Sequence, residues 1–557
     1  MTEQHEHPDP DPADSPAPDR RVSRRSILGA AGISVGAMAI GGGGAVVANR
    51  RDRGPARRDQ GTGNGADGRA DGARRGTESD GADIDRFSRM FDIDRFAEPS
   101  EELTEALTEL GRRGGPMDAN DPLEVGPIRL ITEPELSPDN PDNPTHTAGV
   151  TFVGQFLDHD ITRDAGSQLN RPTGLQRSVN LRTARFDLDS VYGGGPGDMR
   201  ELYDPDDLFQ LRIESGGAFE DLPRGDDGRA VLGDERNDEN LMLNGLHCAF
   251  LMAHNEALAR ARASGLDGVD AFNEARQQVR WHYQWLIVNE WLPQFVGQAM
   301  VDDVRTNGRR FYTDERPRIP VEFQTAAYRF GHSMVRPSYR ANLAGDNGEP
   351  FFGFVFSPDD VDAGNPDDPD HFVGGHRAPR RFIGWQTFFD FGDGEARPNK
   401  RIDTKLSTPL FQLPIFTIGS ARGEDVGPIS LATRNLLRHT TWRLPSGQAL
   451  ASAMGEPVLS AADLPDLDGL GAGLQTSTPL WYYVLREAEV VADGLHLGPV
   501  GGRIVAEVFL GLLELDPTSY LRADEWQPTW PVDDVATGFR TTDLLRMAGV
   551  DPDRRGQ

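Results

Sequence analysis

Cysteine and lysine are nearly absent from this sequence. The 557 residues include one cysteine, Cys248, so no disulfide can form within the chain. Cys248 lies in the apolar run LMLNGLHCAFLMAH, which favours a buried structural thiol over a nucleophile. Just two of the 58 basic residues are lysine, Lys400 and Lys405, and 88 acidic residues bring the net charge to -30. Such a charge opposes binding to a phosphate backbone and argues against nucleic acid as a partner.

Several common catalytic motifs are also missing. The chain has no P-loop, no GxGxxG that opens a βαβ unit, no serine-centred elbow and no clear internal repeat. Strand-like alternation is short and scattered, whereas apolar residues recur at helical spacing over 240–263, 270–300, 320–336 and 501–514. The sequence therefore predicts a mainly α fold, with one large helical domain and few short strands.

The N-terminal region carries an export pattern. Arg24 and Arg25 precede 22 small or apolar residues, Ile27 to Ala48, and the last of these form a small-residue cleavage site. We therefore expect residues 1–48 to be a twin-arginine signal region that engages the twin-arginine export machinery and leads to secretion. A retained N-terminal membrane anchor is the alternative.

A polar linker is predicted to follow the signal region. Residues 49–85 are rich in glycine and in charges of both signs, and they contain almost nothing to bury. Such a segment is expected to be disordered, because it cannot offset the entropy cost of folding. The folded domain is accordingly predicted to span residues 86–550.

The fragment VTFVGQFLDHDITRDAG, residues 150–166, places polar side chains on one side of a predicted helix. Gln155, Asp158 and His159 fall at i, i+3 and i+4, opposite an apolar flank. Taken alone, this pattern is typical of an ordinary amphipathic surface helix. The pattern becomes informative when other fragments of the chain supply chemistry that fits an imidazole, an amide and a carboxylate together.

A second fragment, LRTARFDLDSVYGGG, offers a set of oxygen atoms. Thr183, Arg185, Asp187 and Asp189 alternate, so in an extended segment they project on one side. Two carboxylates, a hydroxyl and backbone carbonyls suit calcium, and Asp160, about 100° round its helix from His159, adds another ligand. A polar turn before YGGGPGD explains the same residues without a metal.

Two further fragments pair a cation with another polar side chain. VLGDERNDENLML sets Arg236 and Glu239 three residues apart at the entrance of an apolar helix, where capping and ion pairing are the default roles. In RNLLRHTTWRLPSGQ, Asn435 and Arg438 share one helical face before a Leu-Pro-Ser break.

The fragment YRFGHSMVRP contains a histidine beside a glycine. His332 is predicted to lie in a helix that ends at Pro337, and Gly331 leaves room for a flat group to approach the backbone. A lone helical histidine is more often a satisfied core residue than a metal ligand.

Together the five fragments resemble, in residue type and order, the animal-type haem peroxidases of the peroxidase–cyclooxygenase superfamily. The resemblance runs from about Phe87 to about Met454, and its most specific parts are GQFLDHDIT, FDLDSVYG, GDERNDE, FGHSMVRP and RNLLR…LPSGQ. It implies a secreted member of the bacterial type, built around a buried haem b. It also implies reduction of hydrogen peroxide, with oxidation of a halide, a pseudohalide or a small organic donor through a compound I intermediate.

The resemblance gives each catalytic position a role. His332 is similar to the proximal iron ligand, Asn435 to the amide on its other ring nitrogen, and Arg438 to the partner of a haem propionate. His159 is similar to the distal base that moves the peroxide proton, and Arg236 to the cation beside it.

Four more positions follow from the same resemblance. Gln155 is expected to face the distal cavity and to hydrogen-bond a water or a halide. Asp158 and Glu239 match the carboxylates that become ester-linked to haem methyl groups. Asn240 replaces the methionine of some mammalian members, so no sulfonium link is expected. Bromide, iodide, thiocyanate or phenols are then favoured over chloride as donors.

Two alternative functions stay open at this stage. A related fatty-acid dioxygenase would need a radical tyrosine three residues before the proximal histidine, but Arg329 occupies that position and Tyr328 lies one residue further away. A non-enzymatic, calcium-stabilised extracellular scaffold would bind no haem, and it leaves the presence of His159, Arg236 and His332 unexplained.

Overall fold

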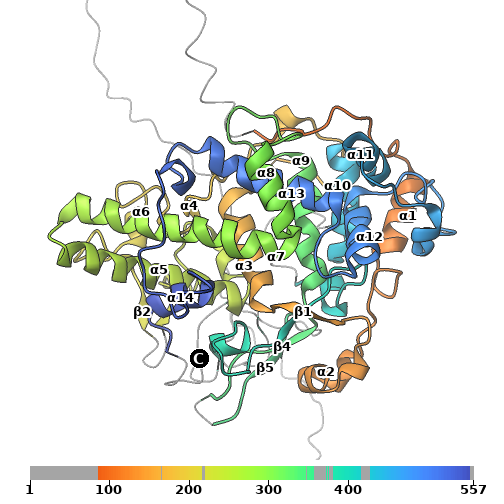
Figure 1. Ribbon diagram of the computed structural model, residues 1–557. Helices are drawn as coiled ribbons and strands as arrows, with labels where there is room; N and C mark the ends of the chain where they lie inside the picture. The colour runs from red at the N-terminus through yellow and green to blue at the C-terminus, as the bar shows by residue number, and fades with distance from the viewer. Residues whose placement is uncertain are drawn as a thin grey trace, which may run out of the picture. The chain divides into compact units, whose positions relative to one another are not determined.

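Helices are the main regular secondary structure of the folded part of the chain in the computed structural model (Figure 1). The structure describes residues 86–164, 166–215, 220–345, 348–356, 372, 374, 381–414 and 427–551. The predicted signal region, 1–48, and the predicted linker, 49–85, lie outside the described residues. Within the described part of the chain, no helix combines the length and the apolar character needed to cross a membrane.

The mainly α prediction is confirmed. The α-helices are α1 (Glu101–Gly111), α2 (Pro127–Thr132), α3 (Gly149–Ile161), α4 (Asp189–Tyr192), α5 (Leu241–Ala263), α6 (Gly268–Leu286), α7 (Leu292–Val296), α8 (Gln298–Asn307), α9 (Val321–Thr325), α10 (Leu431–Trp442), α11 (Gly447–Met454), α12 (Leu480–Ala492), α13 (Pro499–Leu515) and α14 (Thr541–Met547).

The strands form short antiparallel pairs at the edge of the helical core. The pairs are β1 (Asp142–Thr147) with β6 (Pro398–Lys400), β2 (Glu214–Ser215) with β3 (Glu220–Asp221), and β4 (Ser338–Arg340) with β5 (Phe352–Phe354).

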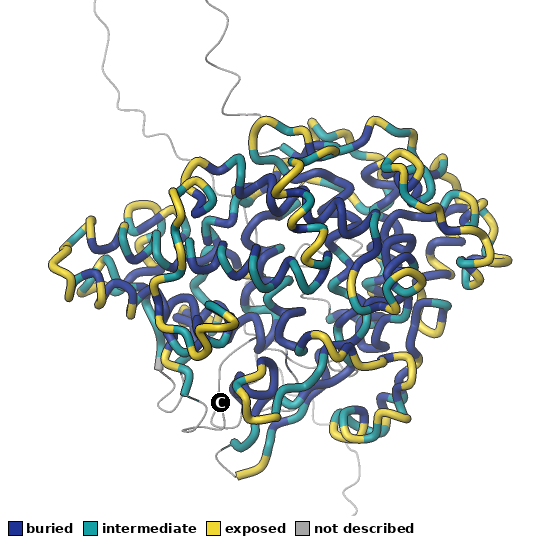
Figure 2. The backbone as a smooth tube through the Cα atoms, viewed as in Figure 1, coloured by how far each residue is buried: buried dark blue, intermediate teal, exposed yellow. Residues whose placement is uncertain are grey.

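Aromatic side chains hold the central helices together. Phe156 of α3 stacks on Phe250 of α5 with ring centroids 4.8 Å apart, and Trp291 stacks on Phe509 of α13 at 5.2 Å. These rings bury large apolar areas, which fixes α3 between α5 and the segment that contains Trp291. The central helices are mostly buried, whereas the outer end of the α5–α6 hairpin is exposed (Figure 2). Cys248 is buried in α5, as predicted.

Two predicted helices are interrupted. The helix expected over 270–300 becomes α6, a π-helical turn at Ile287–Trp291, α7 and α8. Pro293 lacks the N–H that a continuous helix needs there, and Gly297, with φ of 79°, ends α7.

The helix expected over 320–336 divides in a similar way. It consists of α9 and a 3-10 segment, Ala327–Met334, which are separated by Ala326 at φ -128° and ψ -74°. His332 therefore lies on a 3-10 turn and not on an α-helix, and Val335 already has an extended backbone before Pro337.

Candidate active site

Helix α3 carries the three polar side chains that the sequence singled out. Gln155 and Asp158 are half-buried, and His159 is buried at 4% exposure. Nδ1 of His159 lies 2.9 Å from Oδ1 of Asn237, so the ring donates its Nδ1 proton to this amide oxygen and keeps a lone pair on Nε2. Burial, together with the charge of Arg236, lowers the pKa of His159 to about 3. The ring is therefore neutral near pH 7.

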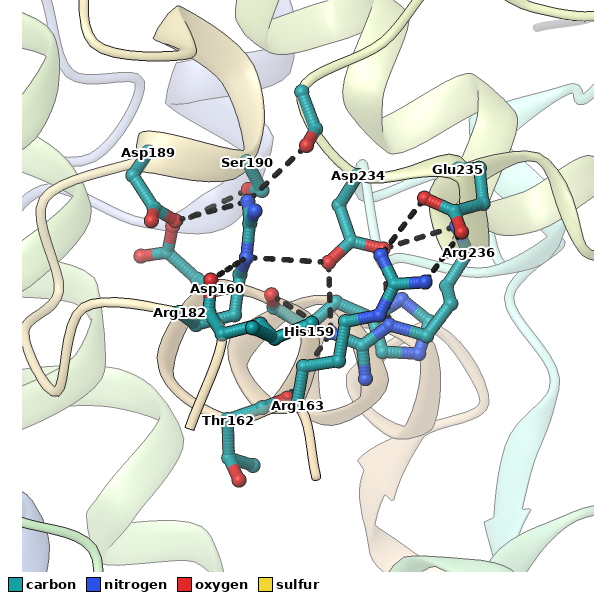
Figure 3. A network of polar contacts seen from close by, with 12 residues as sticks. His159, Asp160, Thr162, Arg163, Arg182, Asp189, Ser190, Asp234, Glu235 and Arg236 are labelled. Atoms are coloured by element: carbon teal, nitrogen blue, oxygen red, sulfur yellow. Dashed lines mark hydrogen bonds and ion pairs between the residues drawn. The ribbon is translucent and has the colours of Figure 1, made fainter. Parts of the chain in front are cut away.

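Arg236 is fixed by the turn that precedes α5, a 3-10 segment at Glu235–Asp238 (Figure 3). Its Nε and Nη2 donate to Asp234 at 2.9 and 2.8 Å. Nη2 also donates to the carbonyls of Thr162, at 3.0 Å, and His159, at 3.2 Å. Nη1 lies 3.9 Å from Asp158. These hydrogen bonds hold the guanidinium in a fixed position.

Asp234 holds the guanidinium of Arg236 in place. Its side chain is fully buried and accepts the backbone N–H of Arg236, which caps the turn. Burial alone would raise the pKa of Asp234, but the hydrogen bonds and charge of Arg236 lower it. Although burial opposes a positive charge, the same bonds raise the pKa of Arg236. Both groups therefore remain ionised.

Gln155 links α3 to the two residues that precede α5. Its Nε2 donates to Glu239 at 3.3 Å, and its Oε1 accepts from Nδ2 of Asn240 at 3.3 Å. Asn240 also caps α5, because its Oδ1 accepts from Leu243 N at 2.9 Å. Burial raises the pKa of Glu239 to about 7, and burial likewise raises the pKa of Asp158.

His332 is positioned from α10. Nδ2 of Asn435 lies 2.7 Å from Nδ1 of His332, and Oδ1 of the same amide accepts from Arg329 at 3.4 Å. In this arrangement Nδ1 is the acceptor and Nε2 carries the proton. A metal on Nε2 would move the proton to Nδ1, so Asn435 would turn its oxygen to the ring. Burial lowers the pKa of His332 to about 3, which leaves the ring neutral as a metal ligand requires.

Arginines concentrate around the same position with few carboxylates to balance them. Burial lowers the pKa of Arg438, and burial with the charge of Arg438 lowers the pKa of Arg329 to about 9 and of Arg434 to about 10. Among the described residues, Nε of Arg438 is buried without a hydrogen-bond partner. Such a cluster is costly unless an anionic group lies against it.

Residues of α3 lie close to the segment Ala327–Met334 and to α10. Tyr328 donates to the carbonyl of Gly154 on α3 at 2.9 Å, and the charges of Arg329 and Arg438 both act on the pKa of Asp158. The side chains of Gln155, Asp158, Arg236, Glu239, Arg329, His332 and Arg438 are half-buried by accessible area. Burial is nevertheless the largest single influence on the pKa of each ionisable one, so the area that these side chains expose faces enclosed space inside the protein and not its outer surface; this enclosed space is called the cavity below.

The residues that surround this cavity fit a haem in three respects. A Cβ atom at Gly331 would meet no atom within 4 Å, so a flat group can approach the backbone beside His332. The unpartnered Nε of Arg438 suits a propionate, and the neutral His332 suits the iron.

A carboxylate cluster lies behind His159. Oxygens of Asp160, Asp187 and Asp189 lie within 4.8 Å of one another. Burial and mutual repulsion raise the pKa of Asp160 well above its ordinary value, and the pKa of Asp189 rises to about 7, with burial the main cause. Tyr283 donates to Asp160 at 3.1 Å. Like charges this close need a cation or shared protons, and oxygen-only ligands suit calcium.

The predicted geometry of this cluster is partly wrong. Residues 183–189 do not form an extended strand, because Leu188 has φ of 60° and α4 begins at Asp189. Thr183 Oγ1 donates to Asp187 at 2.8 Å. The positive charge of Arg185 acts on Asp187. A guanidinium is a cation without an acceptor atom, so Arg185 could bind calcium only through its backbone carbonyl.

An ion-pair network joins this cluster to Arg236 (Figure 3). Arg182 lies 3.4 Å from Asp189 and 3.5 Å from Asp234, which in turn holds Arg236. Because Asp160 follows His159 directly on α3, the cluster and the network both restrain this end of the helix.

Sequence analysis missed four residues of the site: Asp234, Asn237, His247 and Arg329. Asp234 and Asn237 lie within two residues of Arg236 in the fragment GDERNDE, so their closeness to Arg236 in the sequence could have identified them as site residues. His247 lies inside the apolar run of α5, where nothing in the sequence marks its ring as a partner of Asn237.

Parts of the chain are similar to known proteins. Residues 162–361 match the model of the family described as "Animal haem peroxidase", a segment that includes Arg236, Glu239 and His332. The chain is 28% identical over 177 residues to "Peroxidasin homolog pxn-2" of Caenorhabditis elegans, a match that covers 28% of the chain and 13% of that protein. It is 26% identical over 392 residues to "Peroxidasin" of Drosophila melanogaster, covering 63% of the chain and 24% of that protein.

A solved structure shares the fold. "Peroxidase A from Dictyostelium discoideum" superposes with a TM-score of 0.53 at 15% identity, covering 86% of this chain and 94% of that one. The chain thus spans a small fraction of the two peroxidasin relatives, whereas it spans nearly all of the solved peroxidase.

Proposed function

Since the chain belongs, through residues 162–361, to the animal haem peroxidase family, we propose that it is a haem-dependent peroxidase. Its substrates are hydrogen peroxide and a halide, a pseudohalide or a small organic donor. The observation that supports this function most is a pair of neutral histidines, His159 and His332, each held at Nδ1 by an asparagine, with Arg236 bonded to the His159 carbonyl. The matching family domain supports it independently.

Haem would be held by four residues. His332 would offer Nε2 to the iron, Asn435 would orient the ring, and Arg438 and Arg329 would pair with the propionates. Bound haem supplies the redox chemistry that amino-acid side chains cannot.

The protein itself supplies proton transfer and a fixed positive charge. His159 takes a proton from hydrogen peroxide on its free Nε2 and returns it to the leaving oxygen, which departs as water. Arg236 cannot move away from the cavity, because Asp234 and two backbone carbonyls hold it. Its charge therefore stabilises negative charge as the O–O bond lengthens.

Donor choice and covalent attachment depend on the residues near Glu239. Asn240 has no sulfur with which to form a sulfonium link, so the donors expected are bromide, iodide, thiocyanate or phenols. Gln155 is held at both ends, by Glu239 and Asn240, and is available to a water or halide in the cavity. Asp158 and Glu239 are the two carboxyl groups proposed to form esters with haem methyl groups.

Calcium is proposed to bind Asp160, Asp187 and Asp189, with the hydroxyl of Thr183 and the carbonyl of Arg185 as further oxygens. The crowding of three carboxylates supports this site. Neutralised by calcium, the cluster would hold α3 rigid directly behind His159.

Export by the twin-arginine route is proposed from the N-terminal sequence. Changing Arg24 and Arg25 together to lysine should retain the protein inside the producing cell, while the parent is recovered outside the cytoplasm. An unchanged distribution would contradict this route. A mature N-terminus beyond Ala48 would indicate cleavage, and an intact one would indicate the anchored alternative.

The proposed chemistry is tested by stopped-flow reaction of the haem-loaded protein with hydrogen peroxide. His159→Gln should slow the spectral change by about 100-fold or more while haem stays bound, because the base is lost. His254→Gln serves as a control, since this buried α5 histidine binds Tyr192 and the Phe209 carbonyl, away from the cavity. Equal rates in His159→Gln and the parent would contradict the proposal.

Fatty-acid dioxygenation is the second candidate, because Tyr328 is buried and its hydroxyl reaches α3. Loss of oxygenation in Tyr328→Phe with peroxidase turnover retained would support it. Arg329 occupies the position of the radical tyrosine, which favours the peroxidase.

A further inference from the structure

Asn237 joins two buried histidines that belong to different helices. Its Oδ1 accepts from Nδ1 of His159 on α3 at 2.9 Å, and its Nδ2 donates to Nδ1 of His247 on α5 at 3.0 Å. Exposure is 0% for Asn237, 1% for His247 and 4% for His159. The contact is therefore a dry bridge inside the protein, and it lies between Arg236 and Glu239 on the turn before α5.

The bridge restricts where protons can be. A primary amide accepts through its oxygen and donates through its nitrogen. With these two histidine tautomers, turning the amide by half a rotation would set its nitrogen against the Nδ1 proton of His159 and its oxygen against the Nδ1 lone pair of His247. Nδ1 of His247 accepts the amide proton, which keeps the Asn237 nitrogen on that side. The oxygen must then face His159, and the proton of His159 must lie on Nδ1.

We propose that Asn237, held in orientation by His247, is a positioning residue that keeps Nε2 of His159 free to accept a proton in the cavity. The inference rests on the proposed function, since it concerns the base that this function requires. Without the bridge, the proton can sit on Nε2, and a ring in that tautomer cannot take the proton of a peroxide.

Cyanide binding provides a test that does not involve turnover. Cyanide arrives mainly as HCN and binds ferric haem as the anion, so a base near the iron must take its proton. Carbon monoxide binds the ferrous protein with no proton to transfer. The two association rates, followed at the Soret band, separate proton uptake from simple access to the iron.

Four variants define the outcome in the haem-loaded, full-length protein. Asn237→Leu should slow cyanide association by about 10-fold or more, with carbon monoxide association unchanged. Asn237→Asp should restore most of the cyanide rate, because a carboxylate accepts from both rings. His247→Leu should slow cyanide less than Asn237→Leu, since it removes the restraint and keeps the acceptor. His254→Leu, which removes a buried α5 histidine outside the bridge, should leave both rates as in the parent.

Contrary results are equally distinct. A cyanide rate in Asn237→Leu within twofold of the parent would overturn the inference and leave the peroxidase assignment intact. Equal slowing of cyanide and carbon monoxide would also overturn it, because a collapsed cavity would then explain the effect. If Asn237→Leu does not fold, the cyanide association rates of His247→Leu and Asn237→Asp are compared. A slower rate in His247→Leu than in Asn237→Asp supports the inference, and equal rates overturn it. A parent that binds no haem would overturn the proposed function and this inference together.

Discussion

Asn240 shows how one residue limits the chemistry of the cavity. It lies next to Glu239, where a methionine could attach to the haem through sulfur, but its amide caps α5 and holds Gln155. The neighbouring carboxyl groups, Asp158 and Glu239, stay within reach of the cavity and have raised pKa values because of burial. Attachment through esters is therefore expected, without a sulfonium link.

The ester prediction is tested by extraction of the haem. After reaction with hydrogen peroxide, the parent should retain its haem in acidified organic solvent, because the esters have formed. The double variant Asp158→Asn, Glu239→Gln should release its haem under the same treatment, as should the parent before any peroxide is added. Full release from the peroxide-treated parent would rule out the esters.

At the residue scale, sequence patterns identified some of the candidate residues of this site but not the contacts between them. Gln155, Asp158 and His159 follow from helical spacing and from a specific fragment, and so does Arg236. The Asn237–His247 bridge was not predictable, because it needs the path of a 3-10 turn relative to a helix face. Contacts of this kind depend on backbone geometry and not on residue type.

At the scale of elements, α3 combines two functions on two different sides. His159 hydrogen-bonds Asn237 on the turn before α5, while Asp160, the next residue, accepts from Ser190 of α4 and from Tyr283. Asp160 Oδ2 also accepts from Leu188 N at 3.2 Å, at the start of α4. A cation held there would link α3 to α4 and, through Arg182, to the turn that carries Arg236.

Calcium removal is expected to weaken this link. A ligand that binds the folded state alone stabilises it by about 3 kcal/mol at a hundredfold excess over its Kd. A chelator should therefore lower the Tm of the parent measured by scanning calorimetry, and added calcium should restore it. Asp187→Asn should abolish the response, whereas Asp207→Asn, which removes a carboxylate paired with Arg262, should keep it. A Tm independent of calcium in the parent would contradict the site.

Element boundaries followed from the sequence where local chemistry sets them. Asn240 caps α5 at the start of the helix that was predicted over 240–263. The breaks at Ile287–Trp291 and Ala326 were not predicted, because apolar spacing continues through them. At the first break, tertiary contacts act together with Pro293, since Trp291 donates to the Val150 carbonyl of α3 at 3.1 Å and stacks on Phe509.

At the scale of the whole molecule, the last hundred residues complete the core, a role that the sequence did not reveal. Phe509 of α13 packs against Trp291 and Phe323, and Glu487 of α12 accepts the backbone N–H groups of Val500 and Gly501 at the start of α13. The mainly α class was predictable from periodicity. These long-range pairings were not, because they join segments far apart in sequence.

His282 fastens part of this C-terminal region to α6. Its Nδ1 donates to the Gln278 carbonyl at 2.7 Å, and Nε2 accepts from Thr529 N at 3.0 Å and Trp530 N at 3.2 Å. The ring stacks on Trp530 with centroids 4.0 Å apart. Burial lowers the pKa of His282 to about 4. A protonated ring could not accept either backbone N–H.

This histidine predicts acid sensitivity. The unfolded chain takes up the proton near pH 6.5, before the folded protein does, so the stability that His282 contributes is fully present above that pH and is lost toward pH 4. Between pH 7 and 5, the parent should lose about 2 kcal/mol more unfolding free energy than His282→Gln, measured by denaturant titration. Equal losses in the two proteins would contradict the lowered pKa.

Haem binding through His332 underlies the whole of the proposed chemistry. It is tested by the absorption spectrum of the purified, haem-supplemented protein before and after one equivalent of hydrogen peroxide, with His332→Ala beside it. We expect a Soret band in the parent that shifts with peroxide, and no such band in His332→Ala. A parent without a Soret band, or a variant with the parent's spectrum and peroxide response, would contradict it.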